Sequence, residues 1–449
     1  MSAIADLQGR RVWDSRGHPT VEVEVTLSTG AHARAIAPAG ASRGSREAVD
    51  LRDGGPRLKG LDVQRALAAI AGPLADVVRG RDVADQTGID AAMIAADGTA
   101  LKSRLGGNAI VAVSLAVLQA AAVAARLPLW AHLAQVHGQT PTIPLPEVQI
   151  FGGGAHAGRR VDVQDFMVMV PGAASLDEAL AITAEIYHAA GAIMARRGLL
   201  AGVADEGGWW PAFTTNEQAL ETLAEAVIAA GERPGGRVVL SLDIAASEFG
   251  HGGQYRLALE DRAMVAADWA ATLSRWTRDY AIAAIEDPLA EDDSTGMIAF
   301  CAAEGHRLQI IGDDYLVTDA ALIAAAARDR ACNAALIKVN QCGTVTEAIA
   351  ALTAARAAGF GTIVSARSGE TEDTTIAHLA VGLGAGQLKV GSIARSERLA
   401  KWNEALRIEA ALGPGHFAAG APLAATWWGQ GAMPGVAAAG QGAHSSVKV

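Results

Sequence analysis

Three carboxylates each close a short apolar segment of the sequence. Asp243 ends VVLSLD, Glu286 ends AIAAIE and Asp313 ends LQIIGD. If these segments are parallel strands of one barrel, the carboxylates converge at one end, where their charges repel and raise their pKa values. A divalent cation relieves that repulsion, and oxygen ligands without a nearby histidine or cysteine favour Mg²⁺. The alternative, separate helix caps or salt bridges, explains one such acid better than it explains three in consecutive strands.

Two lysines lie at further strand ends, Lys338 at the end of AALIK and Lys389 within QLKVG. Burial in a strand and a neighbouring metal ion both favour the neutral amine, so these lysines are candidate bases near neutral pH. The alternative is that each lysine pairs with one of the acids.

Other polar residues lie in loops after strands. In VADEGGWWP, two glycines let the backbone approach a ligand and direct Glu206 into the cavity. IFGGGAHAG is a weak match to a phosphate loop, and its useful member is His156, although a lone histidine is more often structural. VSARSGETEDTT offers Arg367 and Ser368 as donors to an anion, whereas Ala366 beside them offers no polar group.

The elements that must position these residues form an α/β pattern. From about residue 143, short β-branched strands alternate with helices, which predicts parallel strands joined by right-handed crossovers. An open doubly wound sheet also fits, but polar residues at nearly every strand end favour a closed barrel. We predict an α+β domain over 1–142, the barrel over 143–421 and a loose Gly/Ala-rich tail over 422–449. The proline-containing segment 127–146 is predicted to be a connector.

Composition excludes several classes of function. The 449 residues carry a net charge of −11 and no basic run, which argues against nucleic acid as a partner. Three cysteines outside CxxC spacing and the lack of an N-terminal signal-like segment predict a cytoplasmic protein. The apolar segment 110–125 is somewhat short for a membrane span and is predicted to be a buried helix.

Long motifs in the chain resemble those of the enolase family. They run from VWDSRGHPTVEVEV and GASRGSREAVDLRDG through SLDIAASEFG, IEDPLAEDD, LIKVNQCGTVTEAI and SGETEDTTIAHLAVG to RSERLAKWNEALRIE, and cover about residues 4 to 412. The resemblance implies an enolase-type modified TIM barrel, ββαα(βα)₆, with an N-terminal α+β capping domain. It also implies a cytosolic, Mg²⁺-dependent lyase that is a homodimer or a larger homo-oligomer.

The resemblance also implies a role for each site residue. Asp243, Glu286 and Asp313 match the ligands of one Mg²⁺, and Ser42 matches a loop residue that holds a second. Lys338 matches the base that removes the α-proton, and Glu206 matches the acid that assists the departing β-hydroxyl. Lys389 matches the lysine that grips the substrate carboxylate. His156, Arg367 and Ser368 match residues around the phosphate.

Four departures from the family pattern lie near these positions. Ala366 stands where the family has histidine, and Asp165 stands where it has a glutamate that works with Glu206. Trp209 and Trp210 stand where the family has smaller residues or a pair with a single aromatic, and Arg43 replaces threonine on the mobile loop. Retained metal ligands and Lys338 predict that the enolate chemistry survives, whereas the altered acid side predicts a different substrate or leaving step.

The expected reaction is therefore α-proton abstraction from 2-phosphoglycerate or a close derivative, followed by loss of the β-hydroxyl. The specialised form that fits the departures resembles carboxyphosphonoenolpyruvate synthase of phosphonate antibiotic biosynthesis, with a nucleotide-activated phosphonoformate as a further partner. Ala366 and Asp165 would give room for an extra carboxylate, and Arg43 would supply a counter-charge. Drift in a tolerant paralogue, an ordinary glycolytic enolase and a non-catalytic binding protein are the alternatives.

Overall fold

A three-stranded antiparallel sheet opens the chain. The computed structural model describes residues 2–40 and 44–432. Strands β1 (Ile4–Trp13), β2 (Pro19–Leu27) and β3 (His32–Ile36) pair in sequence order. The alternating segment TVEVEVTL forms β2, whose Val21, Val23 and Val25 are fully buried. Alternation thus directs one face of the sheet into the core of this capping domain.

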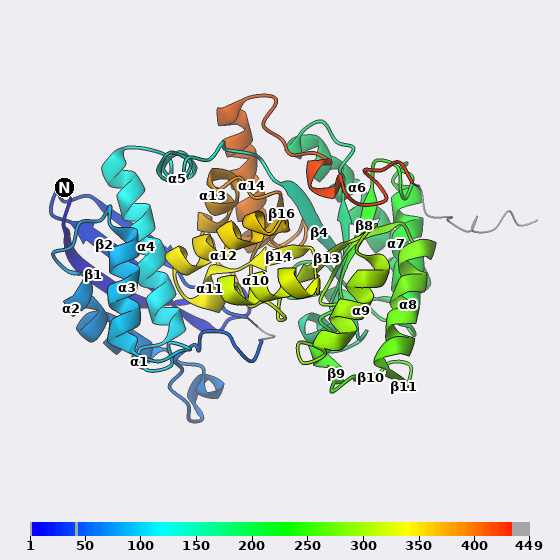
Figure 1. Ribbon diagram of the computed structural model, residues 1–449, viewed down its shortest axis with the longest axis horizontal. Helices are drawn as coiled ribbons and strands as arrows, with labels where there is room; N and C mark the ends of the chain where they lie inside the picture. The colour runs from blue at the N-terminus through cyan, green and yellow to red at the C-terminus, as the bar shows by residue number, and fades with distance from the viewer. Residues whose placement is uncertain (1, 41–43, 433–449) are drawn as a thin grey trace, which may run out of the picture.

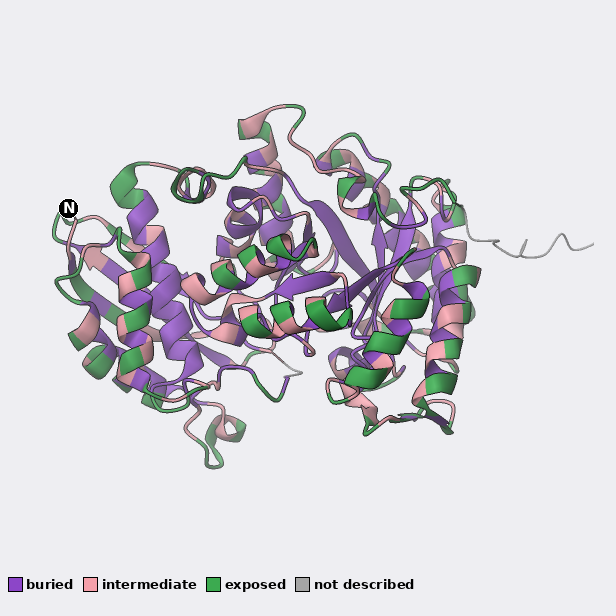
Figure 2. Ribbon diagram, in the orientation of Figure 1, coloured by how far each residue is buried: buried purple, intermediate pink, exposed green. Residues whose placement is uncertain are grey.

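Helices cover that buried face. The helical elements of this domain are α1 (Gln64–Ala69), the π-helical turn η2 (Ile70–Leu74), α2 (Ala75–Val78), α3 (Gln86–Asp97), α4 (Gly107–Ala125) and α5 (Leu129–His137), of which α1, η2, α2 and α4 contact the sheet. Pro73 lies within η2, where its missing N–H and its ring favour a wider turn. Within the described residues, α4 is the one helix long and apolar enough to cross a membrane, but 78% of its most apolar window is buried. It packs on β2 and β3 (Figures 1 and 2), which confirms the buried helix predicted over 110–125.

The predicted connector over 127–146 is wrong in part, because α5 occupies its first half. Pro128 precedes the helix, where a missing N–H costs nothing, and Gly138 ends it in the left-handed conformation. The remaining prolines all follow residue 138, so none of them interrupts the helix.

Eight strands close into the predicted barrel. They are β4 (Leu145–Gly152), β5 (Asp165–Met169), β8 (Val239–Asp243), β12 (Ile282–Glu286), β13 (Gln309–Gly312), β14 (Ala334–Ile337), β15 (Gly361–Ser365) and β16 (Gln387–Lys389). Pairing of β16 with β4 completes the ring, and β5 is antiparallel to both of its neighbours. The order of elements is ββαα followed by six βα units, so the predicted fold class is confirmed.

The barrel helices form an outer layer around the strands (Figure 1). They are α6 (Leu176–Arg197), α7 (Asn216–Ala229), α8 (Ala266–Asp279), α9 (Ser294–Glu304), α10 (Ala320–Asp329), α12 (Val345–Ala357), α13 (Thr375–Gly382) and α14 (Ser396–Leu412), whereas the single turn α11 (Val339–Cys342) follows β14 and contacts α4 and α12. Local sequence sets their ends. Ser175 accepts from the backbone N–H of Glu178, and Glu178 accepts from the N–H of Ala174, the residue before the cap, so α6 begins with a variant of the capping box. Gly198 ends it in the left-handed conformation.

Smaller elements decorate the barrel. Two hairpin-like groups are β6 (Leu200–Val203) with β7 (Trp209–Pro211), and β9 (Gly250–His251) with β10 (Gln254–Leu257) and β11 (Arg262–Val265). Short 3₁₀ helices are η3 (Gly154–Ala157), η4 (Ala246–Glu248) and η5 (Ala421–Leu423) in the barrel domain, and η1 (Arg57–Gly60) in the capping domain.

Residues 422–432, the first part of the predicted loose tail, pack on the barrel. Trp427 is 3% exposed and donates from its indole nitrogen to the carbonyl of Ile282 at 2.7 Å. Burial of so large an apolar side chain explains why this segment is ordered despite its Gly/Ala-rich composition. The rest of the predicted tail, 433–449, lies outside the described residues.

Candidate active site

The predicted site residues gather at one end of the barrel. Asp243, Glu286 and Lys389 are the last residues of β8, β12 and β16, and Asp313 and Lys338 directly follow β13 and β14. This is the end at which TIM barrels carry their active sites. A narrow cavity opens there, and its lining includes His156, Gln164, Asp165, Glu206, Asp243, Lys338, Ser365, Ala366, Arg367, Ser368 and Lys389.

Both lysines pair with acids, which is the alternative that the sequence left open. The ammonium of Lys389 lies 2.7 Å from Asp243 Oδ2 and 2.7 Å from Glu286 Oε2. The ammonium of Lys338 lies 2.5 Å from Asp313 Oδ2. Burial acts to lower the pKa of each lysine, but the neighbouring carboxylates outweigh it and raise both pKa values. The neutral amine expected for Lys338 is therefore not favoured by this arrangement of charges.

Two of the three predicted metal ligands, Asp243 and Glu286, meet at the Lys389 ammonium, whereas Asp313 groups with Asp287 and Asp314. Burial, together with the charges of Asp243 and Asp313, raises the pKa of Glu286 well above its ordinary value, although Lys389 opposes the shift. Glu286 Oε1 is buried and, among the described residues, has no hydrogen-bond partner. An unpartnered buried oxygen within a group of hard oxygen ligands suits Mg²⁺. Ser42, the expected ligand of a second ion, lies outside the described residues, as does Arg43.

A second group of acids surrounds Asp313. Oxygens of Asp287, Asp313 and Asp314 lie within 4.8 Å of one another. The two oxygens of Asp287 accept from the backbone N–H groups of Asp313 and Asp314, at 2.9 and 2.7 Å. Burial is the main cause that raises the pKa of Asp287 to about 8. Asp287 therefore fixes the backbone that carries Asp313.

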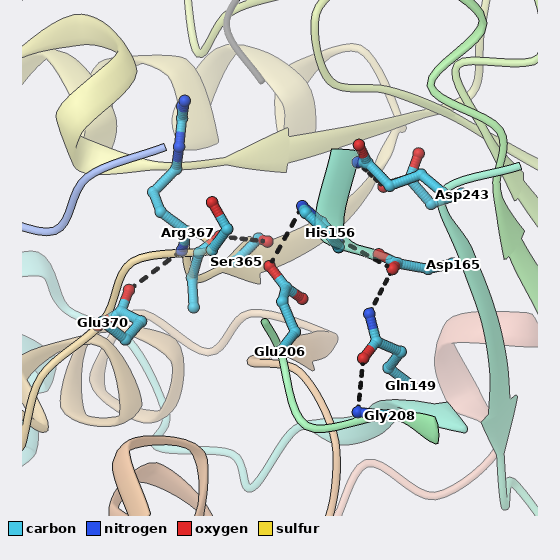
Figure 3. A network of polar contacts seen from close by, with 12 residues as sticks. Gln149, His156, Asp165, Glu206, Gly208, Asp243, Ser365, Arg367 and Glu370 are labelled. Atoms are coloured by element: carbon cyan, nitrogen blue, oxygen red, sulfur yellow. Dashed lines mark hydrogen bonds and ion pairs between the residues drawn. The ribbon is translucent and has the colours of Figure 1, made fainter. Parts of the chain in front are cut away.

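The acid side of the cavity is built from His156, Asp165 and Glu206 (Figure 3). His156 Nδ1 lies 3.3 Å from Asp165 Oδ1, and its Nε2 lies 3.9 Å from Glu206 Oε1. Gln149 donates to Asp165 and accepts from the backbone N–H of Gly208. The structure thus brings His156, expected near the phosphate, to the two acids.

The charges of His156, Asp165 and Glu206 shift one another's pKa values. Burial acts to lower the pKa of His156, but Glu206 and Asp165 outweigh it and raise that pKa. Burial acts to raise the pKa of Glu206, but His156 and more distant cations outweigh it and lower that pKa. Burial raises the pKa of Asp165. The exchangeable proton of this group therefore resides more readily on His156 or Asp165 than on Glu206.

Arg367 and Ser368 follow β15 at another side of the cavity. Arg367 Nη1 donates to Glu47 Oε2 of the capping domain at 2.8 Å. In Figure 3 the guanidinium of Arg367 points away from His156 and Glu206. Arg16 Nη1 donates to Ser368 Oγ at 3.3 Å, so the capping domain contacts both predicted anion donors.

Comparison with protein-family models gives two matches that together span most of the chain. Residues 4–133 match the model described as Enolase, N-terminal domain, and residues 140–426 match Enolase, C-terminal TIM barrel domain. The chain belongs to the enolase family. Membership supports an enolase-type lyase as the general class of activity, and enolase-family proteins generally use Mg²⁺.

Two of the four departures from the enolase pattern border the cavity. Both Ala366 and Asp165 line it. Relative to the family pattern, alanine in place of histidine leaves more space, and aspartate in place of glutamate holds its carboxylate further back. The tryptophans do not belong to its lining. Trp209 stacks on Tyr187 with ring centroids 4.5 Å apart, in space that Gly191 leaves free, and Trp210 packs against Gly158. Trp209 is therefore accommodated against α6, on the outer side of the barrel, and Trp210 lies beside the loop that carries His156.

Sequence reasoning missed several residues of this enolase-family site. Gln164 donates to Asp243 Oδ2 at 3.1 Å, and Gln341 donates to Asp313 Oδ1 at 2.7 Å. Each lies close to a predicted site residue, Gln164 just before Asp165 and Gln341 three residues after Lys338, which was an available signal. Glu47 had none, because its partner Arg367 is 320 residues away in the chain.

Proposed function

We propose that this enolase-family chain removes the proton α to the carboxylate of 2-phosphoglycerate, or of a close derivative, and expels the β-hydroxyl to give an enolpyruvate. The observation that carries the proposal is one cavity lined by both Lys338 and Glu206, with Lys389 between two carboxylates beside them. A base, an acid and a carboxylate-binding cation are the groups that this reaction requires.

Lys338 is the proposed base. It rests on Asp313, so it must give up that contact and its proton before it accepts the α-proton. Bound Mg²⁺, held by Asp243, Glu286 and Asp313, would supply positive charge that stabilises the developing enolate and lowers the pKa of a nearby lysine. Lys389 contributes further positive charge at the substrate carboxylate, in a buried site where charge interactions are strong.

On the other side, Glu206 assists the departing hydroxyl together with its two neighbours. Because the pKa of Glu206 is lowered and that of His156 is raised, we propose that His156 and Asp165 hold the proton that Glu206 delivers. Gln149 orients Asp165 for this exchange. Arg367 and Ser368 are the proposed contacts of the phosphorus group.

The specialised form of the proposal is carboxyphosphonoenolpyruvate synthase. Its support is that Ala366 and Asp165 both border the cavity, where smaller side chains leave room for an additional carboxylate. Such an enzyme would also take a nucleotide-activated phosphonoformate. A cytoplasmic location and a homo-oligomeric state, without nucleic acid or membrane partners, belong to the same proposal.

Phosphorus NMR tests both levels of the proposal. The protein is incubated with Mg²⁺ and 2-phosphoglycerate, with and without nucleotide-activated phosphonoformate. A new carboxyphosphonate signal that needs both substrates supports the specialised enzyme. Phosphoenolpyruvate alone, formed at the rate of an ordinary enolase, would identify a glycolytic enolase. The retained lysines and predicted metal ligands are the observation that supports this second candidate. No Mg²⁺-dependent product from any candidate substrate would refute the lyase proposal and favour a binding protein.

A further inference from the structure

Arg367 is held by the capping domain on two sides. Its side chain is 4% exposed and that of its partner Glu47 is 5% exposed, with Nη1 and Oε2 2.8 Å apart. Gly40 lies against the same guanidinium, because a Cβ built at residue 40 would lie 1.8 Å from Nη2 and 2.5 Å from Cζ. Only a residue without a side chain allows the backbone this approach. The Arg367 guanidinium therefore sits between a carboxylate and a bare stretch of backbone.

The carboxylate of Glu47 is itself fixed by two further contacts. Its Oε1 accepts from the backbone N–H of Gly44 at 3.0 Å and from Gln341 Nε2 at 3.4 Å. Gln341 Nε2 also donates to Asp313 Oδ1 at 2.7 Å. Glu47 thus connects the arginine to the loop of its own domain and, through Gln341, to a predicted metal ligand.

We propose that Glu47 is a positioning residue that holds the guanidinium of Arg367 where it binds the phosphorus group of the substrate. The inference rests on the proposed function, which makes Arg367 an anion-binding residue. A guanidinium recognises an oxyanion through a planar fork of donors, so its orientation decides whether two N–H groups reach the anion together. Without Glu47 the side chain would sample other rotamers, and each binding event would have to order it again.

The sign of the effect separates positioning from simple electrostatics. Glu47→Gln removes a negative charge close to Arg367, and this change alone would strengthen the binding of an anion. Loss of positioning would weaken it. Residues that orient metal ligands through a hydrogen bond typically contribute about 10- to 100-fold to metal affinity, and we use the lower end of that range as the scale for a positioned arginine. We therefore expect Glu47→Gln to bind inorganic phosphate about tenfold more weakly than the unmodified chain.

The experiment measures inorganic phosphate binding by titration calorimetry on the full chain in saturating Mg²⁺. It compares Glu47→Gln, Arg367→Met and the double variant, with Lys102→Met as the matched control. Lys102 joins the capping domain to Glu347 of the barrel at 2.9 Å and makes no contact with Arg367, so it tests the effect of a lost interdomain ion pair alone. Gly40→Ala is a second route, because its methyl group displaces the guanidinium while Glu47 remains. Circular dichroism checks the fold of each variant.

Four results support the inference together: weaker binding in Glu47→Gln, weaker binding in Gly40→Ala, no change in Lys102→Met, and less than about a twofold further loss when Glu47→Gln is added to Arg367→Met. Equal or tighter binding in Glu47→Gln would overturn it, as would full additivity in the double variant or no phosphate binding that depends on Arg367. If Glu47→Gln does not fold, Glu47→Asp takes its place: it keeps the charge but shortens the reach to Arg367, so equal or tighter phosphate binding in that variant would overturn the inference. Because phosphate binding needs no turnover, failure of the lyase assay leaves this test intact.

Discussion

Lys389→Met should make the chain depend on Mg²⁺ for stability. In the structure the Lys389 ammonium touches two buried carboxylates at 2.7 Å each, and removal of one partner from such a buried group typically costs about 3–5 kcal/mol. We expect the free energy of unfolding to fall by that amount in EDTA at pH 8. Mg²⁺ should then restore most of the loss, because it neutralises Asp243 and Glu286 in place of the ammonium.

The loss should also depend on pH. The pKa of Glu286 is already raised in the folded chain, and without Lys389, which opposes that shift, it would rise further. Above an unfolded-state value near 4.5, the folded variant retains a proton that the unfolded chain has released, so its stability falls as pH rises. The difference between the variant and the unmodified chain should therefore be smaller at pH 5 than at pH 8.

Urea unfolding followed by tryptophan fluorescence measures these differences. Lys401→Met is the control, because the buried Lys401 ammonium pairs with Glu370 at 3.0 Å, away from the carboxylates assigned to Mg²⁺. Both variants should be destabilised in EDTA, and Mg²⁺ should stabilise Lys389→Met more than Lys401→Met, because only in Lys401→Met must Mg²⁺ displace the Lys389 ammonium from the two carboxylates. If Lys389→Met unfolds at the same urea concentration as the unmodified chain in EDTA, or if Mg²⁺ stabilises both variants equally, the assignment of Asp243 and Glu286 to a metal is refuted.

Three further predictions concern the base, the cavity and the C-terminal segment. Lys338→Met should lower turnover by about 10²–10⁴-fold and abolish exchange of the substrate α-proton with deuterated solvent, and continued exchange would exclude Lys338 as the base. Ala366→His should fill part of the cavity and lower kcat/KM for a carboxylated substrate by roughly tenfold, while 2-phosphoglycerate turnover holds or increases; equal losses for both would contradict the proposed substrate difference. Trp427→Ala should lower the free energy of unfolding by about 3–5 kcal/mol in urea, and an unchanged midpoint would mean that residues 422–432 contribute little to the barrel.

The barrel and the position of its polar end could be predicted from sequence because both depend on local patterns. Short β-branched runs alternate with helical segments, and an acid or a lysine ends one run after another. Each strand thus carries its own signal, and the closed barrel follows from their number and direction.

What the sequence did not reveal depends on contacts between distant residues. Whether Lys389 faces a metal or two carboxylates is decided by three strands at once, and no spacing along one strand encodes it. The contact of Glu47 with Arg367 crosses from one domain to the other. Trp427 is ordered by its fit against the barrel near Ile282, a property that the small residues around it conceal.

The reversed direction of strand β5 places several residues of the candidate site in one loop, between β4 and β5. Because β5 runs against its neighbours, the chain leaves β4 at Gly152 and enters β5 at Asp165 on the same rim. His156 lies between them, so one uninterrupted stretch of fourteen amino acids, from Gly152 to Asp165, supplies two of the three groups proposed to handle the leaving hydroxyl. Substitutions in this single segment could therefore alter the proposed loss of the hydroxyl while Lys338, the proposed base on the far side of the ring, stays unchanged.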